Sequence, residues 1–439
     1  MSTANGSVRG NTAAAVSRGA QGLPASYKWW VVFLLWFVCF FNYADRQAIS
    51  SVLPLLARDF GFDDPQLGLI ASSFAWVYAA MAPAAGLMAD RAMRKRLVVW
   101  ACIVWSFFTL ATAWCNHLSV FVAVRALTGL GETFYFPAAM ALLSDYHGLN
   151  TRSRALSWHQ SAVYAGTILG SWVAAELAER FGWRVPFYLF GPAGFVLAVV
   201  LTKWLREPER GAADFLSPAS GQNAARQPSV GETSLLILKT PTALFLMAGF
   251  LCANFVATIF LTWTPTFLVE KFHYTIGAAG LTGTIYIHLA SALAVPFAGW
   301  LADRLVRHWR IGRMLVQTLG LVGGAVFVFV VGNTRGTTTL IVAMTGFGLC
   351  KGFYDSGIFA SLYDVIEPRA RGTAAGLMNT IGWGGGALGP LFVGFASKYG
   401  GKPSPVENMS SAIAFGSLFY LGAAACLVGA MMLLKRSPK

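Results

Sequence analysis

Residues 86–91, Gly-Leu-Met-Ala-Asp-Arg, return 213 residues later as Gly-Trp-Leu-Ala-Asp-Arg at residues 299–304. Two other patterns return at nearly the same distance. Gly-Leu-Gly at 129–131 matches Gly-Phe-Gly at 346–348, and Arg-x-Arg at 152–154 matches Arg-x-Arg at 369–371. A repeat of this length divides the 439 residues into two related halves. We therefore expect two copies of one structural unit.

The composition indicates that each unit lies in a membrane. Hydrophobic residues make up 56% of the chain, charged residues make up 12%, and the mean hydropathy is +0.57. A helix needs about 20 mostly apolar residues to cross a bilayer. We predict twelve such spans, at 29–56, 66–89, 97–115, 119–144, 154–178, 185–205, 241–268, 276–301, 313–332, 338–362, 372–396 and 409–434. Because each half has an even number of spans, the second half starts on the same side of the membrane as the first. The predicted fold class is therefore an all-α membrane protein with two parallel six-helix repeats.

The basic residues are distributed unevenly between the two sides of the predicted membrane. The formal net charge is +14, and Lys and Arg gather in the loops on the side of both termini, for example at 91–96, 203–210 and 304–313. This is the positive-inside pattern, which places both termini in the cytoplasm of a cell whose inner or plasma membrane holds the chain. A basic chain that distributes its charge in this way does not need a nucleic acid partner.

The predicted organisation has five parts. A disordered cytoplasmic tail at 1–27 precedes a six-helix bundle at 28–206, and a cytoplasmic linker at 207–238 leads to a second bundle at 239–435 with a short tail at 436–439. The six cysteines lie in or beside apolar spans without metal-ligand spacing, so we expect no metal and no disulfide framework. No motif of a membrane enzyme is present. We expect a monomer without a cofactor.

Six charged residues fall inside the predicted spans, where an ionised side chain costs about 2.5–3.5 kcal/mol. They are Asp45 and Arg46, Arg125 and Glu132, and Lys351 and Asp355. The set is neutral, and the spacings of seven and four residues place the second and third pairs on single helix faces. We expect a water-filled cavity lined by these groups. For Lys351 and Asp355, a structural ion pair remains an equal alternative.

Polar side chains in other spans could complete a chamber for a hydroxyl-bearing solute. The candidates are Tyr78, His159, Gln160, Asn254, Tyr286, His288, Tyr354 and Asn379. Each taken alone is better explained by a hydrogen bond between helices.

The loop at 86–96 resembles the loop between helices 2 and 3 of the major facilitator superfamily, although Met93 stands where a small glycine is usual. The resemblance extends over residues 28–435 and implies the fold of that superfamily. It also implies a cytoplasmic gate in which carboxylates at helix ends face arginines. The residues assigned to this gate are Asp90, Arg91, Arg94, Asp303 and Arg304.

Three segments resemble the anion:cation symporter branch of that superfamily, namely 42–46 in the first span, 129–138 in the fourth and 262–268 in the seventh. The resemblance implies that Arg46 and Tyr43 hold the carboxylate of a sugar acid. It further implies that Asp45 and Glu132 carry the proton, that Arg125 balances Asp45, and that Gln160 contacts hydroxyl groups.

The expected function is proton-coupled symport of a small organic anion by alternating access. An acid substrate would take the arginine, and the carboxylate released from it would take up a proton. Lys351 and Asp355 depart from the branch and leave the substrate open. Spinster-like carriers of lysolipids and sphingolipids share a similar Asp-Arg in the first span, so they are the nearest alternative. A membrane sensor that binds ligand without transporting it is a further one.

Overall fold

The computed structural model describes residues 26–209, 237, 239–367 and 371–436, which form fifteen helices. The first half contains α2 (Tyr27–Phe60), α3 (Asp64–Arg91), α4 (Arg94–Thr112), α5 (Leu118–Thr133), α6 (Tyr135–Tyr146), α7 (Leu149–Phe181) and α8 (Val185–Trp204). The second contains α10 (Pro241–Phe272), α11 (Ile276–Val306), α12 (Gly312–Asn333), α13 (Thr337–Asp355), α14 (Ile358–Val365), α15 (Arg371–Gly386), α16 (Leu388–Tyr399) and α17 (Pro405–Arg436). Most of the predicted tails and linker lie outside the described residues.

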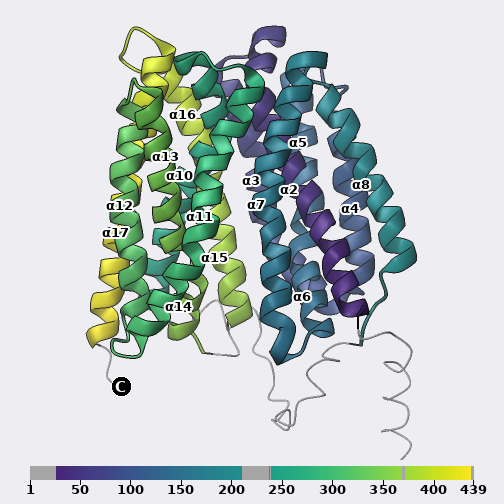
Figure 1. The fold of residues 1–439 in the computed structure, drawn as a ribbon, viewed down its shortest axis with the longest axis vertical. Coiled ribbons are helices and arrows are strands. Elements are labelled where there is room, and N and C mark those ends of the chain that lie inside the picture. Colours follow the sequence, from purple (N-terminus) through teal and green to yellow (C-terminus); the bar gives the residue numbers. More distant parts are fainter. Residues whose placement is uncertain (1–25, 210–236, 238, 368–370, 437–439) are drawn as a thin grey trace, which may run out of the picture.

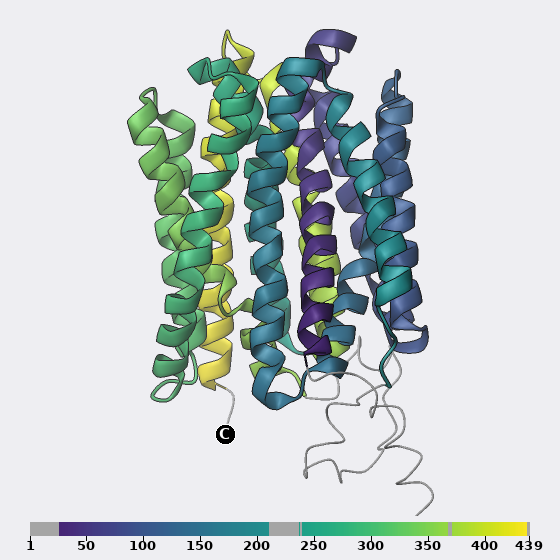
Figure 2. The same ribbon diagram turned by 45° about the vertical axis from the view of Figure 1, so that its right-hand side comes forward.

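The helices form two bundles that stand side by side, with α2–α8 in one and α10–α17 in the other (Figure 1, Figure 2). The start of α2 and the end of α17 lie at the same end of the molecule (Figure 1), here called the termini-bearing end. Eight helices of the described chain are long and apolar enough to cross a membrane: α2, α3, α4, α8, α10, α11, α12 and α17. The predicted all-α membrane fold with two parallel six-helix repeats is confirmed.

The other four predicted spans are formed by α7 and by three pairs of consecutive helices: α5 with α6, α13 with α14, and α15 with α16. The break before α16 has a clear cause. Pro390 has no N–H, so the carbonyl of Gly386 loses its helical donor. The hydroxyl of Thr258 in α10 donates to that carbonyl at 2.5 Å. A break inside a membrane is tolerated where a neighbouring helix supplies such a partner.

Packing and hydrogen bonds join the two bundles from the middle of the molecule toward the end opposite the termini. The bonds are Gln47 to the Leu261 carbonyl (2.7 Å), Ser171 to the Gly280 carbonyl (2.9 Å), the Gly277 N–H to Glu179 (2.6 Å), Ser397 to Asp64 (2.5 Å) and Lys398 to Asp63 (2.6 Å). The Leu261 carbonyl is available because Pro265, four residues later, cannot donate to it. The bundles are therefore fastened to each other at the end opposite the termini.

Candidate functional site

The central feature is an ion pair between Arg46 of α2 and Glu132 of α5. Nε and Nη2 of Arg46 donate to the same oxygen, Oε2 of Glu132, at 3.0 and 2.7 Å. The side chain of Glu132 is fully buried and that of Arg46 is 11% exposed. A charge-assisted pair of this kind is strong in a low dielectric, but each charge loses its hydration when it is buried.

Aromatic rings from three helices surround the guanidinium of Arg46. Its Cζ lies 4.7 Å from the ring centroid of Tyr43, 4.8 Å from Phe74, 5.1 Å from Tyr78 and 5.2 Å from Trp383. Aromatic faces within about 6 Å attract a cation, more strongly when the site is dry. Trp383 belongs to α15 of the second bundle and its ring packs on that of Tyr78, with centroids 5.1 Å apart. Arg46 therefore lies at the interface between the bundles.

A second pair of charges, Asp45 and Arg125, lies behind Arg46 in the first bundle. Asp45 is 2% exposed and its Oδ2 accepts a hydrogen bond from the hydroxyl of Thr109 in α4. Arg125 is 1% exposed, and its guanidinium lies 5.0 Å from the centroid of Phe74. The ring of Phe74 thus contacts both arginines. The charged residues of spans one and four therefore lie together in the first bundle.

Each of these four charged side chains also has buried polar atoms without a hydrogen-bond partner among the described residues. The atoms are Oδ1 of Asp45, Nη1 of Arg46, Nε and Nη1 of Arg125, and Oε1 of Glu132. A buried polar group without a partner costs about 1–3 kcal/mol, and more when it is charged. The cluster is neutral as a whole, yet its hydrogen bonds are incomplete. Such a cluster can accept a further proton or anion.

Several predicted substrate residues lie apart from this cluster. His159 is fully buried in the first bundle, where its Nε2 lies 2.8 Å from the hydroxyl of Tyr135. Tyr354 is 2% exposed and packs in the hydrophobic core with Tyr420. Asn379 is half-buried in α15, and Gln160 lines a separate hollow. Of the predicted substrate residues, Tyr43 and Tyr78 contact Arg46 directly, and Asn379 lies one turn of α15 from Trp383, which also contacts Arg46.

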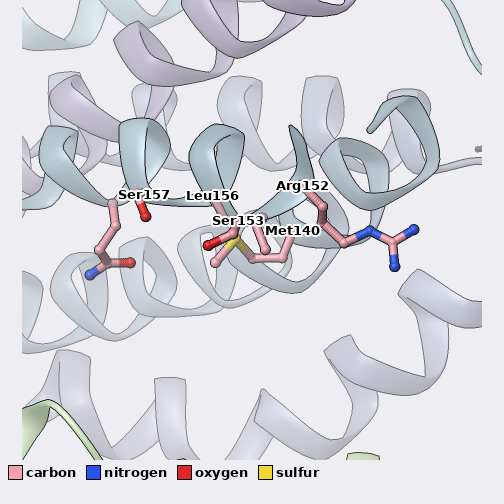
Figure 3. Close-up of a pocket in the computed structure, with 6 residues that line it drawn as sticks. Met140, Arg152, Ser153, Leu156 and Ser157 are labelled. Atoms are coloured by element: carbon pink, nitrogen blue, oxygen red, sulfur yellow. The ribbon is translucent and has the colours of Figure 1, made fainter. Parts of the chain in front are cut away.

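The hollow that Gln160 lines lies on α6 and α7, near the termini-bearing end, and has a volume of 520 Å³ (Figure 3). Its lining is Met140, Arg152, Ser153, Leu156, Ser157 and Gln160. Ser153, Ser157 and Gln160 recur at intervals of four and three residues, which places them on one face of α7. Tyr164 continues this face by one more turn toward the middle of the molecule.

Lys351 and Asp355 form an ion pair within α13 of the second bundle. Their side chains are 20% and 32% exposed. Tyr164 of α7 and His288 of α11 both interact electrostatically with Lys351, and their rings lie 6.4 Å apart. Both side chains are partly exposed, and an ion pair four residues apart on a solvated helix surface contributes only about 0.3–0.5 kcal/mol, which is small beside about 2.5–3.5 kcal/mol for each charge placed in a membrane. This arrangement favours a pair that faces an aqueous space.

Two of the charged residues predicted to gate the termini-bearing end, Arg94 and Asp303, form ion pairs within their own bundles. Arg94 forms an ion pair with Asp145, and the backbone N–H groups of Arg94 and Lys95 donate to Glu207 at 2.8 and 2.6 Å. In the second bundle, Arg313 bridges Asp303 at 3.1 Å and Asp364 at 2.5 Å. Arg91 is exposed and Arg304 lies over the ring of Trp300. The side chain of Asp90 lies outside the described part of the structure.

Sequence reasoning missed four residues that the structure places at these sites, namely Phe74, Thr109, Tyr164 and Trp383. A threonine or tyrosine inside a span is only a weak indication of a functional site, and a phenylalanine such as Phe74 gives no indication at all. Trp383 was visible within the glycine-rich run 382–386, which predicts close packing and bending. In the described ranges, no group of three or more His, Cys, Asp or Glu side chains is arranged to hold a metal ion.

Comparison with known proteins places this geometry in a family. The chain is 31% identical over 386 residues to a sodium-dependent phosphate transport protein 1, chloroplastic, of Arabidopsis thaliana, covering 85% of this chain and 74% of the relative. It is 26% identical over 396 residues to a probable galactarate/D-glucarate transporter of Escherichia coli (strain K12), covering 84% and 86%. Among solved structures, a bacterial homolog of the human lysosomal transporter Spinster in an inward-facing, unoccupied conformation matches with a TM-score of 0.80 at 21% identity, covering 94% of this chain and 99% of that one. Residues 35–339 and 268–439 match the Major Facilitator Superfamily, and the chain therefore belongs to this superfamily of multi-pass membrane proteins.

Proposed function

We propose that the chain is a secondary active transporter that moves a small organic anion, a sugar acid or another carboxylate, together with a proton. The observation that carries the proposal is the Arg46–Glu132 pair at the interface of the two bundles. The names of two relatives, a phosphate transport protein and a probable galactarate/D-glucarate transporter, support an anionic substrate. In this proposal the chain lies in the cell membrane with both termini in the cytoplasm.

The substrate carboxylate binds where the carboxylate of Glu132 now lies. A carboxylate and a guanidinium match in planar geometry, so a substrate can replace the bonds that Arg46 makes to Glu132. Tyr43 and Tyr78, whose rings lie against the guanidinium of Arg46, would place their hydroxyl groups beside the bound carboxylate. Trp383 contributes from the second bundle, so bound substrate contacts both bundles.

Proton coupling follows from the charge balance of the cluster. Asp45 and Glu132 carry two negative charges, and Arg46 and Arg125 carry two positive ones. A bound monoanion makes the buried cluster negative, and a buried excess charge is costly. One proton on Glu132 restores neutrality, because Glu132 has lost its partner. Asp45, which accepts a hydrogen bond from Thr109, interacts electrostatically with Glu132 and is the second carboxylate that can carry the proton. Substrate and proton therefore cross together.

Alternating access requires that the contacts between bundles open and close in turn. The bundles are fastened at the end opposite the termini, while the hollow at Gln160 lies toward the termini-bearing end. Rocking of the bundles would release these fastenings and expose Arg46 to the other side. In the orientation proposed above, the fastened end faces away from the cytoplasm.

The test uses the purified chain in proteoliposomes and a radiolabelled sugar acid. We expect uptake against a concentration gradient when an inward proton gradient is present, and loss of this uptake with a protonophore. Glu132→Gln is expected to keep exchange of substrate but to lose uphill uptake. Glu407→Gln changes an exposed carboxylate of α17 and serves as the control, with transport like that of the wild type. Uptake that ignores the proton gradient would reject the coupling.

A lipid carrier is the second candidate, and one observation favours it. Aromatic side chains of α2 and α7, including Trp29, Phe33, Trp36 and Trp158, line an apolar hollow of 350 Å³. A lysolipid tail would suit such a surface, but it would not use the buried charges of Arg46 and Glu132. Competition between a lysolipid and the sugar acid in the same binding assay separates the two candidates. Measured net flux of either ligand would reject the sensor alternative.

A further inference from the structure

We propose that Lys351 is a second anion-binding cation, so that the preferred substrate carries two anionic groups, one held by Arg46 in the first bundle and one by Lys351 in the second. This inference rests on the proposed function and specifies its substrate class. The second group is a carboxylate or a phosphate monoester, since an ammonium group binds either one as a point charge.

The position of the Lys351–Asp355 pair does not suit a structural role. A pair that holds a fold together joins two helices, but both residues belong to α13 and lie one turn apart. Lys351 precedes Asp355 along the helix, and this order stabilises a helix less than the reverse one. An acidic residue contributes more when it lies four residues before the lysine than when it lies four residues after it. Gly348 and Gly352, each three residues before a member of the pair, lie on the same side of α13 and pack against Ile287 and Ser291 of α11. Small residues therefore make this packing contact, and Lys351 lies at its edge, where it interacts with His288 of α11.

Lys351 lies on the route from the hollow to Arg46. Tyr164, which interacts with Lys351, is on the same face of α7 as Ser157 and Gln160, one turn nearer to the middle. Its partner ring His288 belongs to α11, so the surroundings of Lys351 come from both bundles. An anion that enters along this face of α7 meets the ammonium group of Lys351 before it reaches Arg46.

The two cations are separated by a distance that a short-chain dianion can bridge. Gly166 and Gly170 of α7 lie against the backbone of Phe40 and Ala44 of α2. This fixed offset places Tyr164 level with residue 38, eight residues from Arg46, which is about 12 Å along the helix axis. Part of this distance is covered by the side chain of Arg46, which lies over Tyr43 and so leans toward the start of α2.

Lys351 can extend from the other side. Helix α13 runs toward the termini-bearing end, where α14 follows it, whereas α2 runs away from that end (Figure 1). Side chains lean toward the start of their own helix, so a Lys351 released from Asp355 leans toward the level of Arg46. Asp355 is 32% exposed and can be hydrated after its release. The second anionic group of the substrate then replaces Asp355, as the first replaces Glu132.

The test compares three probes of equal carbon number by equilibrium binding to the purified full chain. These are an aldonate with one carboxylate, the aldarate with two, and the aldonate phosphorylated at its far end. We expect the wild type to bind at least one of the dianions about tenfold or more tightly than the aldonate. The phosphorylated probe decides which second group is preferred. In Lys351→Gln the affinities for the dianions and the aldonate should become alike, whereas Lys351→Arg should retain the preference.

Controls separate this inference from misfolding and from the proposed function. The double variant Lys351→Gln/Asp355→Asn removes the pair without a change in net charge, and it should bind dianion and aldonate alike. Lys435→Gln removes an exposed lysine of the same bundle and should keep the preference. Equal affinities of the wild type for all three probes, or a dianion preference that survives in the double variant, would overturn the second site alone. If none of the three probes binds, the proposed function falls together with it.

Discussion

Replacement of Arg46 by lysine tests whether the planar fork of the guanidinium, rather than its charge, recognises the substrate. Arg46 donates two hydrogen bonds to one carboxylate oxygen, at 3.0 and 2.7 Å, and its plane lies among four aromatic rings. Lysine keeps the positive charge but cannot reproduce the fork. The neutrality of the cluster is preserved, so the coupling to protons should also be preserved.

The expected loss can be estimated from the bonds. One hydrogen bond to a charged group contributes about 1.5–3 kcal/mol, and about 1.4 kcal/mol corresponds to a tenfold change in affinity. Loss of one of the two bonds in Arg46→Lys should therefore raise the Kd for the sugar acid by roughly 10- to 150-fold. Uptake at saturating substrate should still depend on the proton gradient.

Titration calorimetry of the purified variants measures this loss. Arg184→Lys is the matched control, because Arg184 also donates through its guanidinium and stacks on a ring, that of Trp183, but it lies at the end opposite the termini. Its Kd should equal that of the wild type. A Kd for Arg46→Lys within twofold of the wild type, or an equal loss in Arg184→Lys, would refute the assignment of Arg46.

Two further predictions concern a proton site and a fastening between bundles. Thr109→Val removes the hydrogen bond to Asp45, so uphill uptake should fall while the Kd for substrate stays within about threefold, and Thr109→Ser should restore uptake. Burial acts to raise the pKa of Asp63, but hydrogen bonds from Lys398 and from the Gln66 N–H outweigh it and lower the pKa. The Asp63–Lys398 contact is therefore intact at neutral pH and is lost as the pH falls through that lowered pKa. Asp63→Asn should mimic this loss. A cysteine placed beside Arg46 should then react faster with a thiol reagent added on the side of the membrane opposite the termini. An unchanged labelling rate would count against a fastening role for the Asp63–Lys398 contact.

The sequence determined the class of fold because a bilayer leaves few alternatives. A long apolar segment has to satisfy its own backbone hydrogen bonds, and in a membrane a helix does this within the segment. The repeated segments at 86–91 and 299–304 then required two similar bundles. The cost of charge in a membrane marks Asp45, Arg46 and Glu132 as functional candidates from the sequence alone.

Helical periodicity specifies the face on which a side chain lies, but not its partner on another helix. Trp383 lies beside Arg46 although 337 residues separate them, and Thr109 reaches Asp45 from a helix without charges in its middle. His159, as polar in sequence as Gln160, is instead bonded to Tyr135 within one bundle. Asp303 forms its ion pair with Arg313, whereas the repeated segment had assigned Arg304 to the same gate.

The helix breaks also depend partly on the sequence and partly on the tertiary structure. A proline in the sequence shows which carbonyl loses its donor, and this holds for Pro265 and Leu261 as it does for Pro390. Only the tertiary structure decides which group replaces the donor, and for Leu261 it is Gln47 of the other bundle. Local chemistry is set by neighbours along the chain, whereas ligand sites and gates are set by contacts between helices, which depend on how two bundles pack.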